Sequence, residues 1–165
     1  MHSYSFPPIA NNNAKILILG TMPGKKSLEL QEYYGYKYNV FWKILFELLN
    51  SDFSEDYNIK KKLLTDNHIA LWDSLQFCFR KGSADADIKD EIPNDVKTFF
   101  KKHSTVKQVY FNGTAAMNYY KKYVKYSDCL SFYRLPSTSP ANARMSYEEK
   151  LNKWRVITDN LQIDN

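Results

Sequence analysis

The segment KILILGTMPGKKS at residues 15–27 indicates the fold class of the chain. Residues 15–19 form a short, continuous apolar run, which is typical of a parallel strand buried on both faces of a sheet. The run ends at Gly20, and the next residues, through Gly24, include a second glycine and a proline. These residue types let a backbone turn sharply and approach a ligand closely. We therefore expect a buried strand that ends in a candidate ligand-binding loop.

Strand and helix patterns alternate along the rest of the chain. Apolar runs recur at residues 68–72, 106–111 and 130–135, and helical patterns lie at residues 40–50, 94–102 and 114–126. The segment SYEE at residues 146–149 has the form of a capping box that starts a further helix. This order favours a mainly parallel sheet with helices on both faces. No repeat or linker divides the chain, so residues 1–165 are expected to form one domain, with a loop-like insertion at residues 81–95.

The composition favours a nucleic-acid partner. The chain of 165 residues has a formal net charge of +5 and is 16% aromatic, with 13 tyrosines. Positive charge combined with many rings suits a polyanion that carries stackable groups, although a solvated lysine surface would give the same charge. The sequence has no secretory signal and no apolar run of about 20 residues, so we expect a cytoplasmic protein with no membrane partner. Cys78 and Cys129 lack metal-binding spacing and are expected to be reduced thiols, and no metal is expected.

Ligands of open parallel sheets bind beyond the carboxyl ends of the strands. This rule places the candidate site in residues 20–26, 73–82, 112–114 and 136–145. The first segment is not a nucleotide phosphate loop, because its glycines do not follow the GxxxxGK[ST] spacing. The last segment is rich in small residues and prolines, so its backbone amides can approach a phosphate next to a helix start. A plain connecting loop with proline punctuation is the alternative for that segment.

Five segments together resemble the uracil-DNA glycosylase superfamily, and most of all its hypoxanthine-DNA (deoxyinosine) glycosylase branch. They are ILILGTMPG, YYGYKYNVFWKIL, LWDSLQFCFRKGSADADI, VYFNGTAAM and LPSTSPANARMSYEEKLNKW, and they cover nearly the whole chain in order. The resemblance implies a three-layer α/β/α sandwich with a central four-stranded, mainly parallel sheet. It also implies a monofunctional enzyme, without metal or other cofactor, that excises a deaminated base from DNA. The expected base is chiefly hypoxanthine, the product is an abasic site, and the enzyme is expected to be a monomer.

The chain departs from the superfamily at the residue that usually positions the attacking water. Mismatch uracil glycosylases carry an asparagine there, within a GxNPG pattern, whereas this chain has Met22. The hypoxanthine branch assigns the duty to the asparagine before a Phe-Trp pair, which is Asn39 here. Cleavage passes through an oxocarbenium-like sugar, so the water needs placement more than deprotonation. The alternative role for Asn39 is to cap the helix that follows it.

The resemblance also implies which residues bind the base. The loop of Gly20, Thr21, Met22, Pro23 and Gly24 is expected to line the site, and its amides to stabilise charge on the departing base. Tyr34 matches the position of a stacking ring, whereas Tyr33, Tyr36 and Tyr38 suit packing or phosphate contacts equally. Asp73 stands where uracil enzymes present an asparagine. As an ionised carboxylate, it would accept the N1–H of hypoxanthine and refuse a carbonyl edge, or it would cap the next turn or pair with Arg80.

The last loop supplies the expected DNA contacts. Its hydroxyl and amide side chains are expected to hold phosphates, and two longer side chains are candidates for a wedge in the duplex. These residues are Ser137, Thr138, Ser139, Pro140, Asn142, Arg144 and Met145.

Two other functions remain compatible with the sequence. One is a mismatch-specific uracil-DNA glycosylase with the same fold. The other is a non-catalytic nucleic-acid-binding module of that fold, which the methionine at position 22 favours. Base preference and the choice between single and double strands are left open.

Overall fold

A four-stranded parallel sheet forms the centre of the computed structural model, which describes residues 1–124 and 127–163. The strand order is β3-β2-β6-β7, and each neighbouring pair is parallel. The strands are β2 (Ile16–Gly20), β3 (Ile69–Asp73), β6 (Gln108–Asn112) and β7 (Ser131–Leu135). The four predicted strands are thus confirmed, with bounds shifted by one or two residues.

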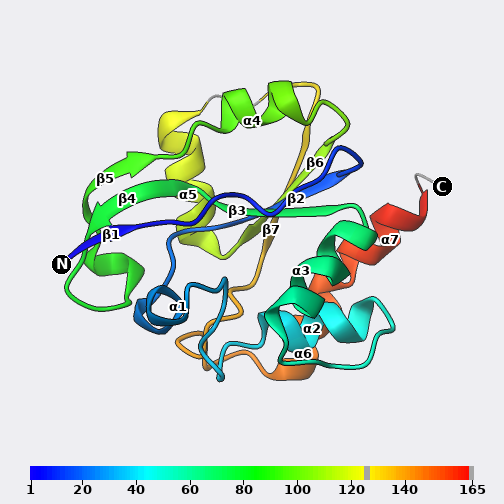
Figure 1. Cartoon of the computed structure of the whole chain (residues 1–165), viewed down its shortest axis with the longest axis horizontal. Helices are drawn as coiled ribbons and strands as arrows, with labels where there is room; N and C mark the ends of the chain where they lie inside the picture. The colour runs from blue at the N-terminus through cyan, green and yellow to red at the C-terminus, as the bar shows by residue number, and fades with distance from the viewer. Residues whose placement is uncertain (125–126, 164–165) are drawn as a thin grey trace.

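Helices cover both faces of this sheet, which confirms the three-layer α/β/α sandwich (Figure 1). Ile16 and Ile18 of β2 point into a core shared with helices on one face, and Leu17 and Leu19 into a core on the other. The first face carries α2 (Phe41–Leu48), α3 (Tyr57–Asp66), α6 (Tyr147–Trp154) and α7 (Val156–Ile163). The second carries α4 (Val96–Lys102) and α5 (Thr114–Tyr123).

The predicted helices are present, with some differences at their ends. The helix expected at residues 114–126 is observed as α5, and residues 125–126 lie outside the described part of the chain. The capping box before α6 is confirmed: the Ser146 side chain accepts from the Glu149 N–H, and the Glu149 side chain accepts from the Ser146 N–H. Helices α1 (Lys25–Leu30) and α3 were not predicted.

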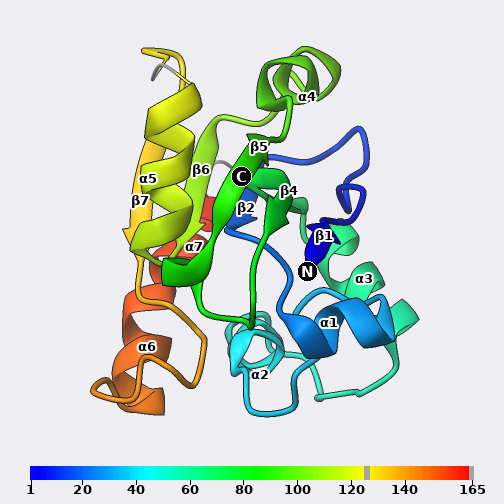
Figure 2. The same ribbon diagram turned by 90° about the vertical axis from the view of Figure 1, so that its left-hand side faces the viewer.

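A second, antiparallel sheet takes in part of the segment that the sequence predicted as a loop-like insertion. Its strands are β1 (His2–Tyr4), β4 (Leu75–Phe79) and β5 (Lys89–Pro93), in the order β1-β4-β5, with a short 3-10 helix at Asp85–Asp87. Figure 2 shows β4 and β5 side by side. The expectation of a loop is borne out at residues 81–88, which contain only the short 3-10 helix, and was wrong at Lys89–Pro93, because β5, with the sequence KDEIP, is an edge strand stabilised by pairing with β4.

The sheet brings the candidate segments together at one edge. Gly20 pairs with Asp73 in the register of β2 and β3, and Asn112 pairs with Leu135 in the register of β6 and β7. These four residues are the last of their strands. All four predicted loop segments therefore begin at the carboxyl edge of the sheet.

Candidate active site

The loop after β2 is held from outside by the segment that follows β4. The buried guanidinium of Arg80, 1% exposed, donates to the backbone oxygens of Pro23 and Ser83. The Lys25 N–H donates to the Ser83 hydroxyl at 2.9 Å. Residues 21–23 are buried. The backbone of this loop is therefore fixed in shape, and the sequence did not reveal the residues that fix it.

Met22 has a packing role at the position where mismatch uracil glycosylases carry an asparagine. Its side chain is buried in a small apolar cluster with Leu75, Cys78 and Ile88. A thioether in such a cluster fills space and offers at most a weak acceptor. The Met22 side chain therefore lacks the amide group that the asparagine offers at this position.

Two oxygen atoms converge above the backbone of Gly20. A Cβ added to this glycine would lie 2.5 Å from Asp73 Oδ1 and 2.6 Å from Tyr34 Oη. Only a residue without a side chain lets the two groups approach this closely. Tyr34 Oη and Asp73 Oδ2 are buried, and neither has a hydrogen-bond partner among the residues that the structure describes. Buried polar atoms without partners are rare in folded proteins and mark places where a ligand or water binds.

Burial governs the ionisation of both groups. Burial and, to a smaller extent, the neighbouring Asp85 raise the pKa of Asp73 and Arg80 lowers it, which leaves the pKa at about 8. Burial also raises the pKa of Tyr34, and Asp73 adds to the effect. The Asn112 amide lies near enough to lower the Tyr34 pKa, but it makes no hydrogen bond to the hydroxyl. Arg80 itself forms its ion pair with Asp85, at 3.5 Å, so the structure does not show the predicted Asp73–Arg80 pair.

Tyr34 is held in an unusual backbone conformation beside α2. Its φ is 54°, in the left-handed region, which costs energy and is concentrated at functional sites. Its ring stacks on Phe41, with the centroids 4.0 Å apart. Tyr33, by contrast, is buried and donates to the Pro7 carbonyl, so it serves packing. Tyr36 and Tyr38 are exposed on the same segment.

Asn39 lies in the segment between Tyr34 and α2, directly before the residue that bonds to the last loop. Its Oδ1 accepts from the Phe41 N–H at 3.0 Å, and Val40, which is the N-cap residue of α2, donates its N–H to the Thr138 carbonyl at 3.2 Å. Asn39 therefore supports the start of α2, as the capping alternative expected, although it is not itself the N-cap. An amide oxygen has two lone pairs, so one remains for a water molecule.

The last loop is fixed from below by Asn112, a residue that the sequence placed only within a candidate segment. Asn112 Nδ2 donates to Thr138 Oγ1 at 2.9 Å, and the Thr138 N–H donates to Asn112 Oδ1 at 3.0 Å. Thr138 is 1% exposed. Its hydroxyl therefore holds the loop on β6 and does not face solvent as a phosphate contact would.

Helix α6 holds the same loop from the side. The buried Lys150 ammonium donates to the Ser139 carbonyl at 3.3 Å, and Trp154 Nε1 donates to the Pro136 carbonyl at 2.9 Å. Lys150 and Trp154 are four residues apart and so lie on one face of the helix. Neither was predicted as a site residue, since an amphipathic pattern does not reveal what its buried face contacts.

The remaining polar residues of the loop bond mainly to the loop itself. Ser137 Oγ accepts from the Ser139 N–H, and Ser139 Oγ accepts from the Ala141 N–H, both at 3.2 Å. Asn142 Nδ2 donates to the Ser137 carbonyl at 3.1 Å. Pro140 and Arg144 are exposed. The loop therefore has a defined shape and presents these two side chains to solvent.

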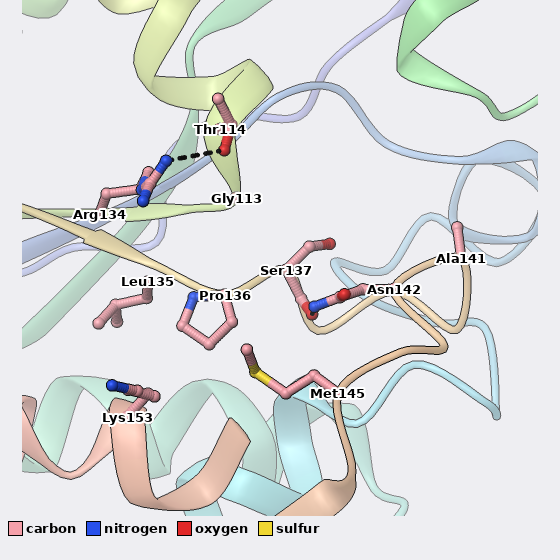
Figure 3. Close-up of a pocket in the computed structure, with 10 residues that line it drawn as sticks. All are labelled: Gly113, Thr114, Arg134, Leu135, Pro136, Ser137, Ala141, Asn142, Met145 and Lys153. Atoms are coloured by element: carbon pink, nitrogen blue, oxygen red, sulfur yellow. Dashed lines mark hydrogen bonds between the residues drawn. The ribbon is translucent and has the colours of Figure 1, made fainter. Parts of the chain in front are cut away.

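A cavity of about 650 Å³ lies beside the last loop, apart from Asn39, Tyr34 and Asp73 (Figure 3). Met145 points into it toward Pro136, and Arg134 donates to Thr114 Oγ1 at 3.5 Å at its other side. Between the two wedge candidates, Met145 is thus half-buried and Arg144 is exposed. The cavity is lined by Gly113, Thr114, Arg134, Leu135, Pro136, Ser137, Ala141, Asn142, Met145 and Lys153.

The described part of the chain contains neither a cluster of metal-binding side chains nor a helix that could span a membrane. No group of three or more His, Cys, Asp or Glu side chains that could hold a metal ion occurs within residues 1–124 and 127–163. In the same residues, no helix is both long and apolar enough to cross a membrane.

Comparison with known proteins identifies the family. Residues 7–161 match the model of the uracil DNA glycosylase superfamily. A Methanosarcina barkeri protein named hypoxanthine DNA glycosylase is 36% identical over 120 residues, which are 72% of this chain and 76% of that protein. A Methanosarcina acetivorans protein of the same name is 32% identical over 155 residues, 92% of this chain and 95% of its own. A solution NMR structure from Methanosarcina acetivorans, provisionally named as a uracil DNA glycosylase, gives a TM-score of 0.84 at 32% identity and covers 98% of this chain and 99% of its own. The chain belongs to the uracil DNA glycosylase superfamily.

Proposed function

We propose that the protein is a monofunctional DNA glycosylase that hydrolyses the N-glycosidic bond of deoxyinosine and releases hypoxanthine. The observation that carries the proposal is that Tyr34 Oη and Asp73 Oδ2 are buried without a hydrogen-bond partner among the described residues, on two side chains that both approach the space above Gly20. The names of the two Methanosarcina relatives support hypoxanthine as the base. Uracil opposite guanine is the alternative substrate.

The base has to leave the duplex before it reaches this site. Extrusion costs a few kcal/mol and is easiest for a badly paired base, such as hypoxanthine opposite thymine. In the proposed complex, the Tyr34 ring stacks on the base with the face opposite Phe41 and recovers about 1–3 kcal/mol. The edge of the base then points toward Asp73. The exposed Arg144 is the side chain best placed to fill the gap in the stack.

Hydrolysis in this complex depends on where the attacking water molecule is held. Asn39 Oδ1 accepts a hydrogen bond from a water molecule and holds it beneath C1′ of the sugar. The C1′–N9 bond breaks, its electrons leave with the purine, and the water oxygen bonds to C1′ while its proton passes to solvent. The purine takes up a proton, and an abasic sugar remains. The backbone N–H groups of Thr21, Met22 and Gly24, in a loop fixed by Arg80, stabilise the charge on the departing base.

The partner in this proposal is DNA that contains a deaminated base. Its phosphates are attracted by the net charge of +5 and held along the loop at residues 136–145. We further propose that the enzyme acts as a monomer, because every group assigned a role here comes from one chain. We also propose that it acts in the cytoplasm, with no metal or other cofactor.

Strand cleavage after alkali tests the proposal on duplexes that carry one inosine, one uracil or one xanthine. Cleavage at inosine in excess of uracil supports it. Cleavage at uracil alone would make the protein a mismatch uracil glycosylase. Binding of all duplexes with cleavage of none would make it a nucleic-acid-binding module.

A further inference from the structure

We infer that Asp73 meets the extruded base as a neutral carboxylic acid, which donates to a carbonyl oxygen of the base and accepts from the adjacent ring N–H. This role rests on the proposed function, since it takes the base as the occupant of the space above Gly20. It extends the substrate class to any deaminated base with that lactam edge. It also replaces the expectation that Asp73 acts as an ionised carboxylate.

The surroundings of Asp73 favour the neutral form. The residue is 3% exposed, and its Oδ2 has no hydrogen-bond partner within the described chain. The nearby cation, Arg80, is used elsewhere, because its guanidinium donates to Pro23 and Ser83 and forms its ion pair with Asp85. Ionisation of a carboxyl group in such a place carries a large desolvation penalty. The Asp73 carboxyl group therefore holds its proton.

Of the groups that act on Asp73, three are neutral tyrosines, one is an acid, and Arg80 compensates its charge only in part. Tyr33 and Tyr34 approach it from the segment after α1, and Tyr57 from the start of α3; each of their pKa values is raised, so all three are neutral. Asp85 faces it from the short helix and raises the Asp73 pKa, while Arg80 lowers it. The resulting pKa of about 8 agrees with a protonated side chain at neutral pH.

A carboxylic acid has the hydrogen-bonding edge of an amide. One oxygen carries a donor O–H and the other is an acceptor, which is the pattern of the asparagine found here in uracil enzymes. This edge fits N1–H and O6 of hypoxanthine, and it fits N3–H and O4 of uracil equally well. Carboxyl groups kept neutral by their sites are known to work as donors in enzymes.

The two oxygens of the acid can exchange their donor and acceptor roles, so the acid alone does not reject adenine. Adenine is excluded earlier, because it is well paired in the duplex and costs more to extrude. The selectivity for deaminated bases is then divided between pairing in the DNA and the edge presented by Asp73.

The pH dependence of excision tests this role of Asp73. We expect the single-turnover excision rate of wild type on inosine to fall as the pH rises through about 8, as Asp73 ionises. Asp73→Ala should be about tenfold to a hundredfold slower, because it leaves the base edge unpaired. Asp73→Asn should restore most of that loss and keep its rate above pH 8. Asp87→Asn, an exposed acid on the short helix, is the matched control and should follow the wild-type profile.

Infrared spectra test protonation without catalysis. The DNA-free wild type should show a protonated-carboxyl band near neutral pH that is missing from Asp73→Asn. A wild-type rate that rises or stays level through pH 8, an Asp73→Asn variant as slow as Asp73→Ala, or an absent band would each overturn the inference. If wild type excises no base, the proposed function fails and the inference fails with it; an intact band would then show that only the protonation is correct.

Discussion

Asn39 combines a structural contact with its proposed role in positioning water. Its Oδ1 accepts from the Phe41 N–H, and the adjacent peptide bonds to Thr138. Asn39→Ala removes the acceptor for the water and should lower single-turnover excision about a hundredfold or more. It should lower the free energy of unfolding by only about 1 kcal/mol, because one helix-start contact is lost, and leave DNA affinity unchanged. Asn58→Ala, at an exposed position in α3, is the control. A near-normal rate for Asn39→Ala would refute the assignment.

Substitution of Gly20 should lower the excision rate, because Asp73 and Tyr34 both approach its backbone closely. In Gly20→Ala, the added Cβ would lie within 2.6 Å of both Asp73 Oδ1 and Tyr34 Oη, so both side chains have to move. Misplacing groups that orient a substrate commonly costs about a hundredfold in rate, and we expect a loss of that order in excision of inosine. Gly82→Ala makes the same chemical change where nothing lies within 4 Å of the new atom. Equal rates for the two variants would show that the space above Gly20 is not used.

Sequence reasoning at this scale selected the residues that are proposed to carry the chemistry and missed those that hold them in place. Asn39, Tyr34 and Asp73 follow from the resemblance, and the structure places them near the first and last loops. Arg80 and Lys150 reach backbone carbonyls 57 and 11 residues away in sequence. Such contacts depend on the tertiary fold, and no local pattern records them. The ionisation of Asp73 was missed for the same reason, because burial sets it.

The elements of the core were predictable, and those at its edge were not. The strands β2, β3 and β6 are almost wholly buried and so appear as apolar runs, and the α6 capping box is a local signal. Strand β5 is short and charged and ends in proline. Its strand conformation comes from pairing with β4, which the residues of β5 do not encode.

Helix α6 should act as a brace for the last loop. Lys150→Met removes the bond to the Ser139 carbonyl and replaces a buried cation, whose pKa burial lowers, with an apolar chain of similar length. Replacing a buried charge in this way is commonly neutral or stabilising, so we expect no loss of thermal stability. The loosened loop should weaken duplex binding about two- to tenfold. Lys102→Met on α4 makes the same change of net charge at an exposed site. If duplex binding weakened equally in both variants, the loss of one positive charge would explain the whole effect.

The whole molecule gathers these parts by ending four parallel strands at one edge. That geometry was inferred from the order of strands and helices, and it confines the candidate site to loops that are far apart in sequence. The antiparallel sheet was not foreseen, yet the segment between β4 and β5 supplies the clamp on the first loop. Two sheets therefore cooperate at the site: one carries the proposed chemistry, and the other immobilises it.

The buried carboxyl of Asp73 should make the stability of the whole fold depend on pH. Its pKa is about 8 in the folded chain and 3.8 as the ordinary value, so between these limits the folded state holds a proton that the unfolded state has released. Folding is then favoured at the acid end of the window, and the free energy of unfolding should fall as the pH rises, by at most about 1.4 kcal/mol per pH unit from this group. Asp73→Asn removes the dependence. Chemical denaturation at several pH values should therefore show a stability gain for Asp73→Asn over wild type that is largest near pH 8 and shrinks toward pH 4. Parallel curves for the two proteins would mean that Asp73 is ionised in the folded state, and the amide-like edge proposed for it would be lost.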